Sequence, residues 1–381
     1  MSSLRPGDRQ LVAALRQHGE LSRDQLARLS GLPRSTVTDA LTRLLRHGVV
    51  TERPMPNAAG RIGRPPRLLA LAAPTGLVGV IALTHQTLQA GVLDFDGTLY
   101  TRQINEAYLA DQQSGMIESG LAMLQDAPGT SRSPGDLTCA VIGVPTPVSD
   151  TRGRPLPNSL APPWIPADPA AELGRHLDVP IWLENDANLG ALGEAAFGAA
   201  ADMASFIYIK IAHGIGAGLV LDRRLYRGTH GLAGELAHIH VEGNGSLCRC
   251  GGRGCLMTAF NTPQLIDWIR TVHPDVGSMS DVLSLAADRD TGVWRLLRDL
   301  GRTIGRSLAD FCVYLAPDGV VLEGILENAG EPLIDGIQEM LDEFTPPAIA
   351  SRVRLVGGLL GDRAELLGAA VLARRAATAS D

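Results

Sequence analysis

The feature that most restricts the fold of this chain is a cysteine-rich segment that follows a histidine. Three of the five cysteines lie within eight residues: Cys248, Cys250 and Cys255. His238 stands ten residues before the first of them. Zn²⁺ binds three thiolates and one imidazole in a closed tetrahedron that leaves no position for a catalytic water. We therefore predict one structural zinc ion per chain. The alternative is three thiols that merely share a polar loop.

The formal charge is divided unevenly along the chain. Residues 1–71 contain twelve arginines, no lysine and five acidic residues, a net charge of +7, whereas the remainder carries −14. A basic segment suits a polyanionic partner, and the acidic remainder does not. The length of 381 residues allows two or three domains. The change in charge places the boundary between a domain at 1–73 and a domain at 74–381.

The composition indicates a protein of the cytoplasm with no membrane partner. No apolar run reaches the length of a membrane span, and the N-terminus lacks the pattern of a signal peptide. Cys139 and Cys312 stand alone in apolar segments. This setting predicts buried thiols, not disulfide partners.

The basic segment has the pattern of a helix-turn-helix domain. Apolar spacing predicts helices over 8–18 and 34–47. Between them, Ser22 and Gln25 form a capping box for a helix that Gly31 ends. The last helix of such a domain enters the major groove with its N-terminal residues first. A small protein-binding bundle is the alternative. The predicted DNA contacts on the third helix are Arg34, Ser35, Thr36, Thr38, Thr42 and Arg43.

A wing follows the third helix. Predicted strands at 49–53 and 67–71 enclose a tip rich in proline, glycine and arginine. Arginines on an extended segment suit a narrow minor groove or adjacent phosphates. A solvated basic linker is the alternative. The predicted wing contacts are Arg61, Arg64 and Arg67.

From residue 77 onward, strands come first and then alternate with helices. The predicted strands are 77–83, 90–95, 98–103, 139–144, 180–183, 205–211, 219–221, 320–322 and 352–356. The predicted helices are 169–177, 187–197, 263–272, 291–315, 332–344 and 363–375. The order of elements occurs twice, which predicts a duplicated α/β domain with a cleft between its halves.

Several segments together resemble the ROK family (repressors, open reading frames and kinases). They are Pro157-Asn158 with Trp164, Glu184-Asn-Asp-Ala-Asn188, Gly214-Ile-Gly-Ala-Gly218, Gly234-Glu-x-x-His238 and Cys248-x-Cys-Gly-x-x-Gly-Cys255. The resemblance implies an α/β fold, with a two-lobed actin-like (ribonuclease H-like) ROK domain preceded by an all-α winged helix-turn-helix DNA-binding domain. The family comprises sugar kinases and transcriptional regulators, and the regulators carry such an N-terminal domain.

The resemblance also implies a sugar site. Carboxylates and amides suit it because each can bridge two vicinal hydroxyls. His238 would ligate zinc and also lie near the sugar. The alternatives are helix capping by Asn185 and Asp186, and a plain surface acid at Glu235. Met257 stands where relatives that bind simple hexoses have glutamate, which favours a substituted sugar or weaker sugar binding. The implied sugar-site residues are Asn158, Asn185, Asp186, Glu235 and His238.

The segments that would hold ATP in a family kinase differ here. Ile81-Ala-Leu-Thr-His85 replaces an Asp-x-Gly-Gly-Thr loop, Ala212-His213-Gly214 replaces Gly-Thr-Gly, and Glu323-Gly324-Ile325 replaces Gly-Gly-Gly. Without glycine, backbone N–H groups cannot approach phosphate oxygens closely. These three differences predict that the chain is not an enzyme.

We therefore predict a DNA-binding transcriptional regulator of carbohydrate metabolism, of the repressor kind. It binds operator DNA as a homodimer or homotetramer and responds to a sugar or sugar derivative. One alternative is an ATP-dependent sugar kinase with an appended DNA-binding domain. Another is a regulator with a vestigial sugar pocket that responds to a protein partner.

Overall fold

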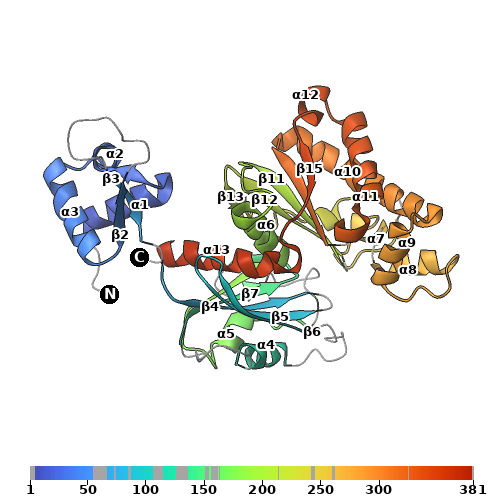
Figure 1. The fold of residues 1–381 in the computed structure, drawn as a ribbon, viewed down its shortest axis with the longest axis horizontal. Helices are drawn as coiled ribbons and strands as arrows, with labels where there is room; N and C mark the ends of the chain where they lie inside the picture. The colour runs from blue at the N-terminus through green and yellow to red at the C-terminus, as the bar shows by residue number, and fades with distance from the viewer. Residues whose placement is uncertain are drawn as a thin grey trace. The chain divides into compact units, whose positions relative to one another are not determined.

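The computed structural model divides the chain into two compact units (Figure 1). The first is Met1–Thr75 with Arg374–Asp381, and the second is Gly76–Ala373. The predicted site residues Asn158, Arg61 and Arg64 lie outside the part of the chain that the structure describes. The structure describes residues 5–54, 67–72, 74–84, 87–105, 115–125, 136–150, 154–155, 162, 164–212, 214–241, 245–259, 262–324 and 326–379.

The first unit is a winged helix-turn-helix domain. Its elements are α1 (Pro6–His18), β1 (Leu21–Ser22), α2 (Arg23–Ser30), α3 (Arg34–Arg46), β2 (Val50–Pro54) and β3 (Arg67–Leu71). The strands form an antiparallel sheet in the order β1-β3-β2. Leu11, Leu26 and Leu41 from the three helices share one buried core with Leu69 of the sheet. The two wing strands are confirmed. β1 was not predicted, because two residues are too few to show an alternating pattern.

The caps of α2 agree with the sequence. The Ser22 hydroxyl accepts from the N–H of Gln25 at 3.3 Å, and the Gln25 side chain accepts from the N–H of Ser22 at 2.8 Å. Gly31 adopts the left-handed conformation with φ +67° at the other end. A capping box and a left-handed glycine satisfy backbone groups that the helix ends leave open. Together they fix the short turn that leads into α3.

The first lobe of the second unit contains a five-stranded sheet. Its elements are β4 (Leu77–Leu83), β5 (Leu88–Asp94), β6 (Leu99–Asn105), α4 (Met116–Gln125), β7 (Leu137–Val144), β8 (Val148–Asp150), β9 (Arg154–Pro155), α5 (Pro169–Leu173) and β10 (Ile181–Asn185). The sheet order is β10-β7-β4-β5-β6, and β8 pairs with β9 separately. β4 pairs antiparallel with β5 and parallel with β7. Helices α4 and α5 lie on one face of this sheet (Figure 1).

The second lobe repeats this topology. Its elements are β11 (Phe206–Ile211), β12 (Ile215–Leu221), β13 (Arg224–Tyr226), η2 (Leu236–His238), α7 (Leu256–Ala259), α8 (Thr262–Arg270), α9 (Met279–Ala287), α10 (Thr291–Leu315), β14 (Gly319–Gly324), α11 (Leu326–Phe344), α12 (Pro347–Ala350), β15 (Arg354–Gly357) and η3 (Gly361–Arg363). The sheet order is β13-β12-β11-β14-β15. Again the first strand pairs antiparallel with the second and parallel with the fourth. The predicted duplication is therefore confirmed.

Two helices join the lobes by crossing in backbone contact. They are α6 (Asp186–Phe197), which follows β10, and α13 (Ala364–Ala379). A Cβ added at Gly193 of α6 would lie 2.3 Å from the carbonyl oxygen of Ala364. One added at Gly368 of α13 would lie 1.8 Å from that of Leu189. Glycine at both positions lets the helices approach this closely, so the crossing holds the lobes on either side of a cleft.

Some elements differ from the sequence prediction. α4 and α9 were missed, and α11 begins at Leu326, ahead of the proline at which we expected it to start. Cys139 and Cys312 are buried and unbonded as predicted, and burial raises their pKa values to about 12 and about 11. Among the described residues, no helix has both the length and the apolarity needed to cross a membrane.

Candidate functional site

The predicted metal ligands come together at the loop that precedes α7. Nδ1 of His238 lies 3.5 Å from Sγ of Cys248. Sγ of Cys250 lies 3.7 Å from Sγ of Cys255. All four donor atoms lie within 4.8 Å of one another. The four side chains thus form one cluster of one imidazole nitrogen and three sulfurs.

The spacing of these atoms fits a tetrahedral zinc ion. With Zn–S of ~2.3 Å and Zn–N of ~2.0–2.1 Å, two neighbouring sulfurs stand about 3.8 Å apart, and a sulfur and a nitrogen about 3.6 Å apart. Both separations given above agree with these values. Gly251 and Gly254 adopt φ of +90° and +65°, which other residues seldom adopt. The glycines therefore let the loop turn back and bring the three sulfurs together.

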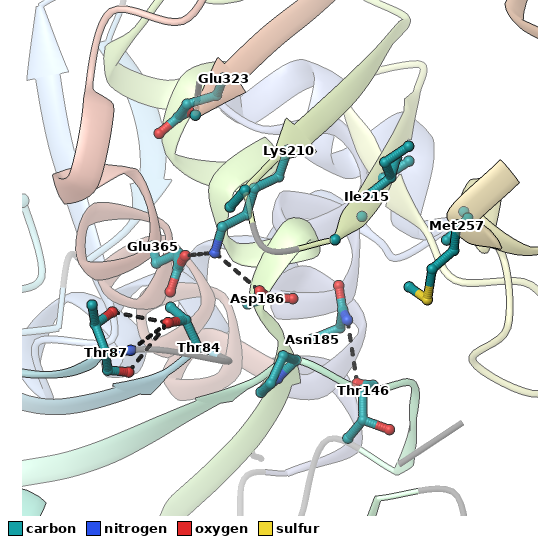
Figure 2. Close-up of a pocket in the computed structure, with 18 of the residues that line it drawn as sticks. Thr84, Thr87, Thr146, Asn185, Asp186, Lys210, Ile215, Met257, Glu323 and Glu365 are labelled. Atoms are coloured by element: carbon teal, nitrogen blue, oxygen red, sulfur yellow. Dashed lines mark hydrogen bonds and ion pairs between the residues drawn. The ribbon is translucent and has the colours of Figure 1, made fainter. Parts of the chain in front are cut away.

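A cavity of about 360 Å³ lies between the two lobes of the second unit (Figure 2). Its volume is in the range of small-molecule binding sites. The first lobe contributes the ends of β4, β7 and β10, and the second contributes β11, β14 and the loop that carries the metal cluster. Four of the five residues implied to bind sugar line it. They are Asn185, Asp186, Glu235 and His238.

Asn185 and Asp186 also begin helix α6, as the capping alternative expected. The Asn185 side-chain oxygen accepts from the N–H of Asn188 at 3.1 Å, and its amide donates to the carbonyl of Thr146 at 3.2 Å. Asp186 Oδ1 accepts from the N–H of Ala187 at 2.9 Å. Both residues therefore stabilise the helix start that places them at the cavity.

A lysine that the sequence analysis missed lies in the middle of the cavity wall. Lys210 Nζ donates to Asp186 Oδ2 at 3.0 Å and also to Glu365 of α13 (Figure 2). Burial alone lowers the pKa of the ammonium, but the two carboxylates outweigh this and raise it above its ordinary value. Burial raises the pKa of Glu365, although Lys210 opposes this. Lys210 is the only lysine in the chain and stands in an otherwise apolar strand. That isolation was the signal that could have revealed it.

A second buried carboxylate occupies the position expected for a nucleotide. The Tyr208 hydroxyl donates to Glu323 Oε2 at 2.8 Å. Burial raises the pKa of Glu323 to about 8, and the nearby charges of Glu194 and Glu365 act in the same direction. Glu323 also lines the cavity. This end of the cavity therefore contains more carboxyl groups than cations.

The opposite end of the cavity adjoins the metal cluster. His238 Nε2 faces Glu235 Oε2 at 3.9 Å, while its Nδ1 faces the cysteines. Burial and the charge of Asp186 raise the pKa of Glu235 to about 7. Arg249, between two of the cysteines, and Met257 also line this end. The metal loop thus forms one wall of the cavity and determines where His238 lies.

The described residues on either side of the two segments that resemble kinase phosphate loops are hydrogen-bonded to each other. In the first, the N–H of Thr84 donates to the carbonyl of Thr87 at 2.9 Å, and the N–H of Thr87 donates to the Thr84 hydroxyl at 2.8 Å. In the second, the N–H of Ala212 donates to the carbonyl of Gly214 at 2.9 Å. These three N–H groups are therefore already bonded within the protein. His85, His213 and Ile325 lie outside the described residues.

The predicted DNA-contacting side chains on α3 differ in their surroundings. Arg34, with 85% of its side chain exposed, makes a 3.3 Å ion pair with the exposed Asp24, its one ion pair within the described part of the chain. Arg43 instead donates to the buried Asp8 of α1 at 2.7 Å and is 28% exposed. Burial raises the pKa of Asp8, but hydrogen bonds from Arg43 and the backbone of Arg5 outweigh it and hold the pKa below its ordinary value. Arg43 therefore also ties α3 to α1.

The remaining predicted DNA contacts lie at the surface. Ser35, Thr38 and Thr42 are exposed on α3 and Thr36 is partly exposed. The hydroxyls of Thr38 and Thr42 donate to carbonyls one turn earlier and keep their acceptor lone pairs. Arg67, at the start of β3, is paired with Glu52 at 2.9 Å. Polar and cationic groups thus remain available along α3.

Sequence comparison decides the family. A profile of the ROK family matches residues 84–376. The chain belongs to the ROK family. A second profile, for a winged helix-turn-helix DNA-binding domain, matches residues 7–51 of this ROK protein. The first match therefore covers most of the second unit, and the second match covers helices α1 to α3 of the first unit.

The ROK protein is similar both to repressors and to kinases. It is 26% identical to the xylose repressor of Bacillus spizizenii, over 94% of this chain and 92% of the repressor. The solved structure of a ROK transcriptional regulator, a homologue of the Escherichia coli MLC protein, matches with a TM-score of 0.76 at 24% identity and 97% coverage of both chains. A Streptomyces griseus ROK glucokinase, solved with glucose and AMPPNP, matches with a TM-score of 0.67 at 26% identity, over 79% of this chain and all of the kinase. The two-lobed fold is thus common to regulators and kinases.

Proposed function

We propose that this ROK protein is a transcriptional repressor of carbohydrate metabolism that binds operator DNA and responds to a sugar or sugar derivative. The observation that carries the proposal is the presence of a basic winged helix-turn-helix unit in the same chain as the ROK domain. The xylose repressor matches across both parts, and the winged-helix profile covers α3, the helix that would enter the major groove. A repressor works where its operator lies, so we assign this protein to the cytoplasm.

The cavity argues against phosphoryl transfer. A kinase needs a free carboxylate to accept the proton of the attacking hydroxyl. Asp186 matches that base, but its Oδ2 is bonded to Lys210 and its Oδ1 to the backbone. The N–H groups of Thr84, Thr87 and Ala212 are already bonded within the protein, and the buried Glu323 side chain fills part of the cavity. Both features oppose the binding of a nucleotide, because phosphate oxygens need free donors and space. We therefore assign Asp186 to binding and not to catalysis.

The metal cluster supports the sugar site. His238, Cys248, Cys250 and Cys255 would hold one zinc ion in a structural role, with no open ligand position. When bound, zinc supplies a rigid crosslink between the loop and η2. Because His238 Nδ1 faces the cluster, its Nε2 is directed towards Glu235 and the cavity. In metal sites, the ring nitrogen of a histidine that does not bind the metal commonly forms a hydrogen bond that fixes the ring. Here Nε2 of His238 would be placed to bond a sugar hydroxyl.

DNA recognition is assigned to residues 1–73, and effector binding to residues 74–381. On α3 we propose Arg34, Ser35, Thr36, Thr38, Thr42 and Arg43 as contacts, with Arg61, Arg64 and Arg67 of the wing. Helix-turn-helix domains bind half-sites about one helical turn apart, so we propose a homodimer or homotetramer. The sugar would act by favouring one of two arrangements with different operator affinity.

The test is a salt-controlled binding assay with DNA from upstream of the gene for this protein. D-xylose, D-glucose, N-acetylglucosamine and their phosphates are added in turn. We expect sequence-specific binding whose affinity one sugar class changes. Binding without sequence preference, with a salt dependence typical of phosphate contacts alone and no response to any sugar, would refute the proposal. ATP-dependent phosphorylation of a sugar would favour the kinase alternative. DNA binding that changes with a protein partner and with no sugar would favour the alternative of a regulator with a vestigial sugar pocket.

A further inference from the structure

The cavity contains polar groups that the proposed sugar site does not use. We infer that the end of the cavity around Glu365 and Gln89 is a second subsite that is specific for hydrogen-bond donors. The effector is then an unphosphorylated sugar derivative. Its ring is held by Asp186, Glu235 and His238, and it has further hydroxyl or amino groups beyond that ring. This inference rests on the proposed function, because it concerns the same effector. It adds to that function that the effector carries no phosphate and extends beyond the sugar ring.

Two buried acceptor atoms at this end lack a partner. Among the residues that the structure describes, none is a hydrogen-bond partner of Oε2 of Glu365 or Oε1 of Gln89, and both residues line the cavity. Glu365 is 7% exposed and Gln89 is 6% exposed. Buried oxygens of this kind cost free energy unless a donor reaches them. Oε1 of Gln89 accepts hydrogen bonds, and Oε2 of Glu365 does so while its carboxyl group is ionised, as its ion pair with Lys210 favours. A group that satisfies both oxygens must therefore donate.

The two acceptors lie on elements that pack together. Gln89 and Gly91 share one face of β5, because side chains on a strand alternate. A Cβ at Gly91 would lie 3.2 Å from Leu366, the neighbour of Glu365 at the start of α13. The two acceptor residues therefore belong to neighbouring elements that both border the cavity. Figure 2 shows Glu365 beside the Thr84–Thr87 turn, with Lys210 between it and Asp186.

The charge of this end opposes an anion. Asp362, Glu323 and Glu365 line it. The two cations nearby are already paired, because Arg102 of β6 pairs with Asp362 and Lys210 pairs with Asp186 and Glu365. A phosphate here would face the carboxylates of Asp362 and Glu365, and the N–H groups of Thr84, Thr87 and Ala212 are already bonded within the protein. A hydroxyl or an ammonium group would instead meet acceptors. The other cation in the wall, Arg249, lies between two cysteines of the metal loop.

The single lysine provides a direct test in the wild-type protein. Labelling the full chain with ¹³C,¹⁵N-lysine gives one side-chain NMR signal, that of Lys210, at the junction of the two subsites. The probes are D-glucose, D-glucosamine and maltose, each compared with D-glucose 6-phosphate or D-glucosamine 6-phosphate. We expect the unphosphorylated probes to shift the Lys210 signal and each phosphate to bind at least tenfold more weakly than its parent. A phosphate that binds more tightly than its parent and shifts the signal would overturn the inference.

Two variants separate the subsite from the ring site. Gln89→Leu removes one orphan acceptor and should weaken glucosamine and maltose at least fivefold while glucose changes less than twofold. Glu365→Gln removes one negative charge and should reduce the discrimination against the 6-phosphates at least threefold. Glu118→Gln, at an exposed site on α4, is the matched control and should leave every affinity unchanged. Equal effects on all probes in both variants would contradict a separate subsite.

Two small probes keep the subsite testable if the sugar function fails. If no sugar or sugar phosphate binds, the proposed effector is wrong. Ethanolamine and inorganic pyrophosphate are then titrated against the same Lys210 signal. A shift with ethanolamine and none with pyrophosphate would support a donor-specific subsite independently of sugars. A shift with pyrophosphate alone, or with neither probe, would overturn the inference.

Discussion

Lys210 Nζ lies 3.0 Å from Asp186 Oδ2 and is also bonded to Glu365. One ammonium thus compensates two carboxylates that come from the starts of α6 and α13, the two helices that cross between the lobes. The cavity between the lobes therefore contains a network of paired charges.

Replacing Lys210 by Met should destabilise the second unit strongly. Two buried carboxylates would face each other without a cation, and breaking a buried pair in this way costs about 3–5 kcal/mol. Urea unfolding monitored by tryptophan fluorescence gives the free energy. The double variant Lys210→Met, Glu365→Gln should recover part of the loss, because it removes one of the stranded charges. Wild-type stability in the single variant would show that the ion pair contributes nothing.

Replacing Cys250 by Ser should abolish zinc binding. A serine hydroxyl stays protonated and is a poor zinc ligand, so the S₃N set loses one donor. Metal analysis of the purified chain should fall from one zinc ion to near zero, and the thermal transition should move lower. Cys312→Ala, which removes a buried thiol far from the cluster in sequence, should keep its metal. Equal zinc contents in the two variants would refute the assigned ligands.

Glu323→Gln should change how stability depends on pH. The pKa of Glu323 is about 8 in the folded protein against an ordinary value of 4.5. Burial and the charges of Glu194 and Glu365 raise it, while Tyr208 and Lys210 oppose the shift.

The sign of the effect follows from proton binding. Between pH 4.5 and 8 the folded state keeps a proton that the unfolded state has released, so a rise in pH favours unfolding. The stability of Glu323→Gln relative to wild type should therefore increase across this window, by an amount on the order of 5 kcal/mol, and stay level above it. Unfolding free energies at intervals of one pH unit test this. A flat difference would show that Glu323 titrates normally.

Arg34→Ala and Arg43→Ala should separate DNA contact from stability. Arg34 pairs with an exposed acid, so its loss should change stability by less than about 0.5 kcal/mol while weakening operator binding. Arg43→Ala leaves Asp8 buried without its partner and should cost about 1–3 kcal/mol of stability. Urea unfolding and DNA binding at fixed salt are measured on both variants. Unchanged stability in Arg43→Ala would assign that arginine to DNA contact alone.

Features whose cause is local could be predicted from the sequence. The metal ligands lie within eighteen residues of one another, and the glycines between them allow the turn that the cluster needs. The Ser22 capping box and the duplicated order of strands and helices depend on neighbouring residues and on hydrophobic periodicity. The short strands and α9 were missed because they have too few residues, or too weak a pattern, to be distinguished from loops.

The sequence by itself determined the set of zinc ligands, the winged helix-turn-helix pattern and the two-lobed fold class. Each of these depends on residues close together in the chain or on a regular repeat. Only the tertiary structure decided that Lys210 joins Asp186 to Glu365, that Arg43 holds Asp8, and that Gln89 and Glu365 keep acceptors without partners. Lys210 and Glu365 are 155 residues apart in the chain. Whether a buried polar atom finds a partner depends on how distant elements pack around it, and that packing exists only once the lobes have closed around the crossing of α6 and α13.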